Sequence, residues 1–231
     1  MHHVLFWDID GTLLTTGRAG IFAWEAAVER VSGVKSDLAA FQTAGLTDME
    51  IAQALSERHG TGKGSDTQAM VKIYEEALPG CLPLRKGRVL PGARENLEYL
   101  RGQTHVLPLL LTGNTRAGAA AKLHHYGLDG FFAHGAYGDE APDRTGVATR
   151  AMELARELLG EEPRPERTYV IGDTPYDIAC GDAIGARTVA VASGGSTREQ
   201  LQEHGPWLLL DRLPEPSEFA SLLGLPTPEA P

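Results

Sequence analysis

Two carboxylates, those of Asp8 and Asp10, follow directly on a run of four apolar residues at 4–7, and the pair Gly11-Thr12 comes next. The apolar run predicts a buried strand. Its break at Gly11 lets both carboxylates face the carboxyl edge of a parallel sheet, where such sheets bind ligands. Like charges this close repel each other, so the pair favours a divalent cation, a shared proton, or both. One carboxylate can then act as a nucleophile and the other as a proton donor and acceptor.

A second candidate site is the turn Thr112-Gly113-Asn114, which ends an apolar run and precedes a predicted helix. A hydroxyl group and the unpaired amides of a first helical turn suit a phosphate oxygen, and the helix dipole favours an anion there. We interpret Thr112 as a candidate catalytic residue and Gly113 and Asn114 as candidate substrate-binding residues. The same pattern alone also describes an ordinary strand–turn–helix junction with Thr115 as the N-cap.

Two further carboxylates, Asp173 and Asp177, lie one helical turn apart after an apolar run at 168–171. Oxygen ligands, completed by waters and a substrate phosphate, are what magnesium prefers. Either residue taken alone could instead pair with the dipole of a helix N-terminus. The two together are candidate metal-site residues.

These three motifs, in this order, resemble the signatures of the haloacid dehalogenase-like hydrolases, most of whose members are phosphatases. The nearest subgroup is the phosphoglycolate phosphatase-like members with a helical cap. The resemblance implies that Asp8 attacks phosphorus to form an aspartyl-phosphate and that Asp10 exchanges the proton. It also implies a Mg²⁺ site formed by Asp8, the Asp10 carbonyl and Asp173. Asp177 would hold a metal-bound water or the basic residue that neutralises the phosphate.

The chain departs from the family pattern at the third signature, where the family places a lysine before a helix. The segment 133–146 contains no lysine and offers Arg144 instead. An arginine carries a permanent charge and can bond phosphate or carboxylate bidentately, so Arg144 is a candidate to stabilise Asp8 and the transferring phosphoryl group. The alternative is a surface pair with an aspartate such as Asp143. Lys122 is a poorer candidate because it falls inside a predicted helix.

Apolar strands that alternate with amphipathic helices predict an α/β fold with a doubly wound, parallel, Rossmann-like sheet. The predicted core elements are strands at 3–9, 105–111, 131–134, 168–171 and 187–192, and helices at 92–102, 115–126, 147–159 and 175–184. The motif residues all fall at the ends of predicted strands. They are therefore expected at one edge of the sheet.

The segment 17–87 lacks strand-like runs and predicts three helices, at 19–31, 47–59 and 66–78. We interpret it as a small all-helical cap inserted into a core made of residues 1–16 and 88–231. A cap that closes over the site would exclude water and select the substrate.

Two loops could also reach the substrate. Thr47 and Asp48, which open the second cap helix, are candidate substrate-binding residues, although Thr47 also fits a capping box with Glu50. The loop 193–196 follows the last predicted core strand at the ligand edge. The favoured interpretation there is an ordinary loop with a helix cap at Ser196.

The amino-acid composition restricts the classes of molecule that the protein is expected to bind. A net charge of −10 argues against nucleic acid, and no apolar run approaches the roughly 20 residues that cross a bilayer. No signal peptide is recognisable, and two cysteines are too few for a disulfide framework, so a cytoplasmic location is expected. The expected partner is a small phosphorylated metabolite, with no nucleic acid and no membrane, and the protein is expected to be a monomer or a homodimer.

The function predicted from these features is a Mg²⁺-dependent phosphatase that hydrolyses a small phosphomonoester through an aspartyl-phosphate. A sugar-phosphate mutase uses the same residues and differs only in the group that accepts the phosphoryl group, so it is the leading alternative. A non-catalytic phosphate-binding module is disfavoured because both Asp8 and Asp10 are present.

Overall fold

A computed structural model describes residues 2–60 and 64–226. Within these residues, six strands form one parallel sheet in the order β5-β4-β1-β6-β7-β8. The strands are β1 (His3–Trp7), β4 (Val106–Leu111), β5 (Gly135–Ala136), β6 (Thr168–Gly172), β7 (Arg187–Val191) and β8 (Leu208–Leu210). The predicted α/β, doubly wound parallel fold is confirmed.

Helices cover both faces of the sheet, which explains why β1 is buried along its whole length. Leu5 and Trp7 pack against one set of helices, while Val4 and Phe6 pack against the other. The first set contains α4 (Ala93–Leu100), α5 (Arg116–His125) and α9 (Pro216–Leu222), and the second contains α6 (Arg144–Leu159) and α7 (Pro175–Ala183). Alternate residues of one strand thus enter two separate cores.

Two predicted elements of the core were wrong in position. The edge strand expected at 131–134 is the two-residue strand β5, because Phe131 and Phe132 pack on the core beside the sheet instead of pairing with β4. The helix expected at 147–159 begins at Arg144, because the Asp143 side chain accepts a hydrogen bond from the amide of Gly146 at 2.8 Å and caps the helix three residues earlier.

The carboxyl-terminal part contains elements that the sequence analysis did not predict. α8 (Arg198–Glu203) packs Leu201 against Ala190 and Ile178, and β8 extends the sheet beside β7. The proline-rich tail at 214–231 predicts one short helix followed by disorder; the helix is α9, and residues 227–231 lie outside the described residues. The sequence also predicts a turn between helices at 60–65, of which 61–63 lie outside the described residues.

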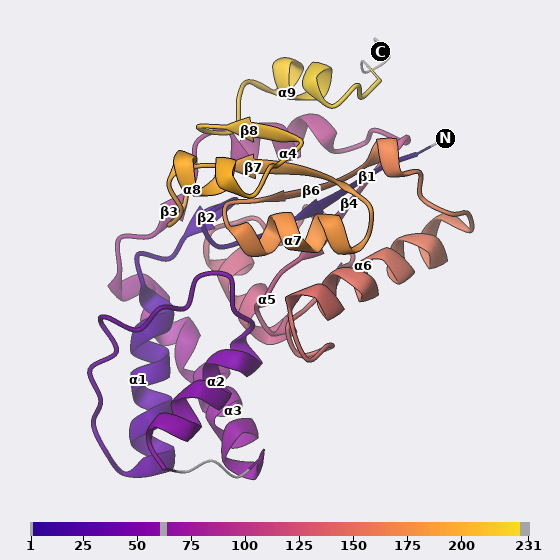
Figure 1. The fold of residues 1–231 in the computed structure, drawn as a ribbon. Helices are drawn as coiled ribbons and strands as arrows, with labels where there is room; N and C mark the ends of the chain where they lie inside the picture. The colour runs from indigo at the N-terminus through magenta and orange to yellow at the C-terminus, as the bar shows by residue number, and fades with distance from the viewer. Residues whose placement is uncertain (1, 61–63, 227–231) are drawn as a thin grey trace.

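Three helices gather at one end of the molecule, beyond the edge of the sheet (Figure 1). They are α1 (Ala19–Ser32), α2 (Asp48–Arg58) and α3 (Gly64–Cys81), and they enclose their own apolar cluster. Its centre is Trp24, whose ring stacks on Tyr74 with the centroids 4.0 Å apart. Domain boundaries at 17 and 87 stay a prediction.

Two short strands, β2 (Leu14–Thr15) and β3 (Arg88–Val89), pair antiparallel where the chain leaves the sheet for these helices and returns from them. A 3₁₀ turn, Leu82–Leu84, follows α3. None of the described helices is long and apolar enough to cross a membrane.

We expect Trp24→Ala to loosen the three helices selectively. The indole is 2 % exposed, and removing a buried tryptophan costs about 3–5 kcal/mol. Hydrogen exchange measured by mass spectrometry should accelerate at the amides of α1 and α3 far more than at those of β1. Phe22→Ala on the same helix removes a ring that is 43 % exposed and serves as the control. Equal acceleration in helices and sheet would contradict a separate cap.

Candidate active site

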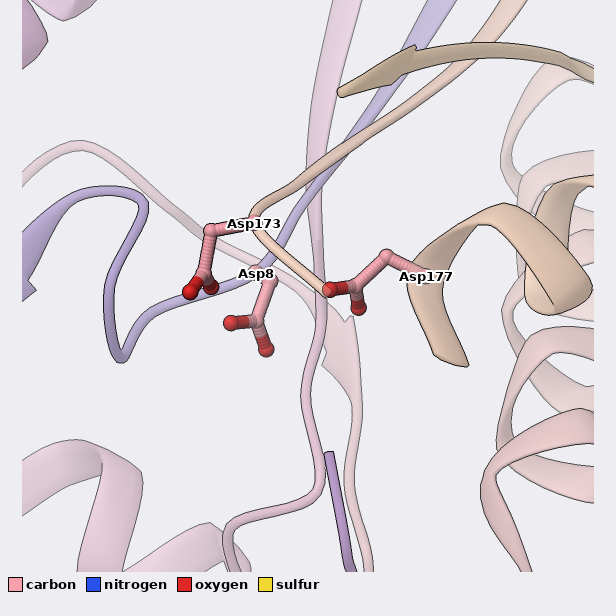
Figure 2. Close-up of side chains that lie close together, drawn as sticks. All are labelled: Asp8, Asp173 and Asp177. Atoms are coloured by element: carbon pink, nitrogen blue, oxygen red, sulfur yellow. The ribbon is translucent and has the colours of Figure 1, made fainter. Parts of the chain in front are cut away.

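Three buried carboxylates converge at the carboxyl edge of the sheet (Figure 2). Asp8 follows β1, Asp173 follows the neighbouring strand β6, and Asp177 lies in the first turn of α7. One oxygen from each side chain lies within 4.8 Å of the others. The structure therefore brings together the predicted nucleophile and the two acidic residues of the last motif.

Arg144 is the cation of this cluster. Its guanidinium donates hydrogen bonds to Asp177 Oδ1 and, at 3.4 Å, to Asp8 Oδ1, and the side chain is only 7 % exposed. The alternative of a surface pair with Asp143 is wrong, because Asp143 caps α6 and Arg144 points inward from the first turn. Arg144 Nε is buried with no hydrogen-bond partner among the described residues.

Asp177 anchors Arg144. Its Oδ2 accepts hydrogen bonds from the Thr174 amide at 3.0 Å and from the Thr174 hydroxyl at 2.6 Å, while Oδ1 faces Arg144. These contacts form a capping box that fixes the carboxylate in the first turn of α7. Of the two roles predicted for Asp177, the geometry favours holding the basic residue.

Asp173 is enclosed by two glycines. A Cβ atom on Gly11 or on Gly194 would collide with the Asp173 carboxylate. The Gly195 amide donates to Asp173 Oδ2 at 3.2 Å, and the Ser193 hydroxyl donates to the Gly11 carbonyl at 2.7 Å. The loop 193–196 thus closes over the site and is more than an ordinary connection.

The expected helix cap at Ser196 is one residue too early. Thr197 is the N-cap of α8, in a capping box with Gln200. Ser196 therefore belongs to the loop beside the acidic cluster.

Asp10 is held by Lys122, the residue that sequence reasoning set aside. Lys122 Nζ donates to Asp10 Oδ2 at 2.6 Å and also to Asn114 Oδ1, and its side chain is 7 % exposed. The helix location was correct, and Arg144 rather than Lys122 contacts Asp8, but Lys122 still belongs to the site because this face of α5 points toward Asp10. Lys122 lies four and seven residues after Gly118 and Thr115, a spacing that places all three on one helical face but does not say what that face contacts.

The Thr112 turn lies beside this pair. Thr112 is fully buried, and its Oγ1 accepts a hydrogen bond from Asn114 Nδ2 at 2.7 Å. The same Nδ2 donates to Asp10 Oδ2 at 2.8 Å. Gly113 and Asn114 line the cavity in front of Asp8, and their role in substrate binding stays a prediction. The N-cap of α5 is Thr115, as the alternative interpretation of this turn expected.

Asp48 ties the helices to the sheet edge. Its Oδ2 accepts a hydrogen bond from the Thr115 amide at 2.8 Å, and its own amide donates to the Gly113 carbonyl at 2.8 Å. Asp48 also lines the cavity. Thr47 forms the expected capping box with Glu50 and is fully buried. Among the described contacts, both residues therefore serve the attachment and start of α2.

The cavity between the three helices and the sheet edge measures about 420 Å³. Asp8, Asp10 and Asp173 line it from the sheet side. Ile21, Trp24 and other apolar residues line it from the side of α1 and α2. The size lies within the range of roughly 300–1,000 Å³ that small-molecule sites occupy.

Negative charge exceeds positive charge in the cluster of Asp8, Asp173, Asp177 and Arg144. Burial raises the pKa of Asp8 to about 7, the neighbouring Asp177 adds to the effect, and Arg144 opposes it. Burial, Asp177 and Asp8 also raise the pKa of Asp173 well above its ordinary value. Three buried carboxylates share one arginine, and their ligand atoms are all hard oxygens. This donor set fits a divalent cation such as magnesium.

Comparison with known proteins agrees with this geometry. The family model for haloacid dehalogenase-like hydrolases matches residues 2–185. The chain belongs to this family of hydrolases. The match includes every motif residue discussed above, from Asp8 to Asp177.

Individual relatives of this hydrolase extend over most of its length. The protein named probable phosphatase IndB from Dickeya dadantii (strain 3937) is 27 % identical over 221 residues, which cover 93 % of this chain and 92 % of the relative. A predicted phosphoglycolate phosphatase from Haemophilus somnus 129PT superimposes with a TM-score of 0.71 at 15 % identity, covering 96 % of each chain. A candidate beta-phosphoglucomutase from Bacteroides vulgatus gives 0.71 at 20 % identity, covering 96 % of this chain and 89 % of the other. The two structures show the shared fold.

We expect Lys122→Met to lower the free energy of unfolding by about 1–3 kcal/mol, since it leaves the part-exposed Asp10 and the buried Asp48 without their cation. Although burial acts to lower it, Asp10 and Asp48 raise the pKa of Lys122, so the amine is charged in the folded state. Urea denaturation measures the loss. Lys72→Met, at an exposed position on α3, is the matched control. Similar stability of both variants would contradict the role of Lys122.

Stability of the metal-free hydrolase should depend on the ionisation of Asp8. Because folding raises the pKa of this carboxyl from 3.8 to about 7, its contribution to stability is present at low pH and is lost as the pH rises through 7. We expect Asp8→Asn to melt at a higher temperature than the wild type at pH 8 in EDTA, and the gap to narrow at pH 5. Asp211→Asn, at an exposed position, should match the wild type at both pH values. A destabilised Asp8→Asn at pH 8 would overturn this expectation.

Proposed function

We propose that this hydrolase is a Mg²⁺-dependent phosphatase that acts on a small phosphomonoester with Asp8 as the nucleophile. The observation that carries the proposal is the position of Asp8: it is buried at the sheet edge, held by Arg144, and shares a cavity with Asp10. The name of the Dickeya dadantii relative agrees with this activity.

In the proposed reaction, a carboxylate oxygen of Asp8 attacks phosphorus as the bond from phosphorus to the leaving oxygen breaks. Asp10 donates a proton to that leaving oxygen and the alcohol departs. Asp10 then takes a proton from a water molecule, whose oxygen attacks the aspartyl-phosphate. Inorganic phosphate leaves and the Asp8 carboxylate is restored.

The contacts of Asp10 suit this exchange. Lys122 and Asn114 both hold its Oδ2, so Oδ1 can face the substrate, and the side chain is 41 % exposed on the cavity side. The two anchors fix the position of the carboxylate. A positioned acid or base of this kind contributes about 10²–10⁴-fold to a rate.

Arg144, together with the Thr112 turn, would hold the phosphoryl oxygens. Arg144 lines the cavity beside Gly113 and Asn114, which supports this assignment. A guanidinium fixed between Asp8 and Asp177 would meet the developing charge without rearrangement.

Asp8, the carbonyl of Asp10 and Asp173 would hold the magnesium ion, while Asp177 positions Arg144. A bound magnesium ion supplies positive charge that lets an anionic nucleophile approach an anionic phosphate. The expected partner remains a small phosphorylated metabolite, and a monomer or homodimer in the cytoplasm remains the prediction.

Phosphate release from a panel of phosphomonoesters, with magnesium or EDTA, tests the proposal. We expect magnesium-dependent release that falls at least 10³-fold in Asp8→Asn and about 10²–10⁴-fold in Asp10→Asn, as loss of nucleophile and general acid require. Asp211→Asn, which changes an exposed carboxylate on the surface, should retain full activity.

Two other outcomes would contradict the proposal. Transfer of the phosphoryl group to a sugar hydroxyl in place of water would identify a mutase, the activity in the name of the Bacteroides vulgatus structure. Release that survives in Asp8→Asn would exclude the aspartyl-phosphate route.

A further inference from the structure

Four basic side chains line the cavity, and they fall into two pairs. Lys122 and Arg144 are buried and bonded to carboxylates at the sheet edge. Within the described part of the chain, Arg18 and Arg88 make no ion pair with a carboxylate. We propose that Arg18 and Arg88 form a subsite for a second anionic group on the substrate, so that the preferred phosphomonoester carries a carboxylate or another phosphate.

This subsite rests on the proposed phosphatase function, and it lies where the chain passes between the sheet and the three helices. Thr15 on β2 is the direct partner of Arg88 on β3 in the antiparallel pair. Arg18 follows three residues later, at the start of α1. The outgoing and returning segments thus each contribute one arginine to the lining of the same cavity.

Arg18 is held in a costly conformation. Its φ is 68° and its ψ is 23°, and it has the only positive φ among the described residues other than glycine. The left-handed region disfavours any side chain with a Cβ, and a glycine here would avoid that cost. Strain retained beside a cavity is characteristic of functional positions. The arginine side chain must therefore offer something that glycine does not.

The guanidinium of Arg18 is also oriented. One terminal nitrogen, Nη2, donates to the carbonyl of Ala39 at 2.6 Å. This contact fixes the group against the segment that leads to residues 43–46, which line the cavity as well. The remaining N–H groups can bind an anion, and a guanidinium binds carboxylate or phosphate in two parallel hydrogen bonds.

Local charge supports an anion at this point. The chain carries a net charge of −10, so its overall field repels anionic ligands. The carboxylates that line the cavity belong to the acidic cluster or to the Lys122 network: Asp8, Asp10, Asp48, Asp173 and Asp177. Arg18 and Arg88 are therefore the two cavity-lining cations, within the described part of the chain, that are not bonded to a carboxylate. With the first phosphate at Asp8, a cavity of about 420 Å³ leaves room for a leaving group that reaches them.

The test compares substrates that differ in one charged group. 3-Phosphoglycerate and glycerol 1-phosphate share a three-carbon skeleton and differ in a carboxylate, while fructose 1,6-bisphosphate and fructose 6-phosphate differ in a second phosphate. We expect the wild type to favour at least one doubly anionic compound by tenfold or more in kcat/KM. The pair that shows the preference identifies the second group as carboxylate or phosphate.

Variants assign the preference to the two arginines. Arg18→Gln and Arg88→Gln should each lower kcat/KM at least tenfold on the substrate with two anionic groups, mainly through KM, and less than twofold on its counterpart with the reacting phosphate alone. Arg58→Gln, at an exposed position at the end of α2, removes the same charge away from the cavity and should change neither. Equal losses on both members of a pair would overturn the subsite, as would a wild-type preference for the members that carry the reacting phosphate alone.

Two further measurements distinguish a failure of the subsite from a failure of the proposed phosphatase function. Arg18→Gly should melt at a higher temperature than the wild type while losing the preference, because it relieves the backbone strain; a lower melting temperature would indicate a structural role and contradict the proposal. Calorimetric titration of Asp8→Asn with the same compounds tests binding without turnover. The subsite is supported, even where phosphate release fails, if Asp8→Asn binds the member of a pair with two anionic groups at least tenfold more tightly than the other member. The double variant Asp8→Asn/Arg18→Gln should then bind both members equally. Equal binding of both members of each pair by Asp8→Asn itself would refute the subsite.

Discussion

The constraint on which the site depends is the crowding of three buried carboxylates around one arginine. Asp8, Asp173 and Asp177 place ligand oxygens within 4.8 Å of one another, and Arg144 contacts two of them. Burying like charges together is unfavourable unless cations and hydrogen bonds compensate. Much of the surrounding structure provides this compensation.

Several local features position the side chains of this carboxylate–arginine cluster. The Asp143 cap starts α6 at Arg144, which directs the guanidinium inward, and the capping box of Thr174 holds Asp177 to receive it. Gly11 provides the space that the Asp173 carboxylate fills. These devices lie on separate segments of the chain, but each serves the same group of charges.

A second network joins the helices to the sheet. Lys122 from α5 bonds Asp10, and the Asp48 carboxylate from α2 accepts the amide of Thr115 at the start of α5. Burial raises the pKa of Asp48 to about 7, although Lys122 acts in the opposite direction. On the other side of the cleft, Gly45 must lack a side chain because a Cβ would collide with the ring of Tyr176. The helices thus rest on the loops that also carry the candidate catalytic groups.

The sequence by itself determined the α/β class and the order in which the motif residues follow the strands along the chain, because apolar periodicity and turn residues are local properties. Asp8, Asp10 and Asp173 could be assigned to one sheet edge since parallel strands bring their carboxyl ends together. Only the tertiary structure decided which cations serve them. How helices from distant segments pack against that edge determines the inward position of Arg144, the burial of Lys122 and the strained backbone of Arg18. The spacing of residues within one segment does not specify this packing.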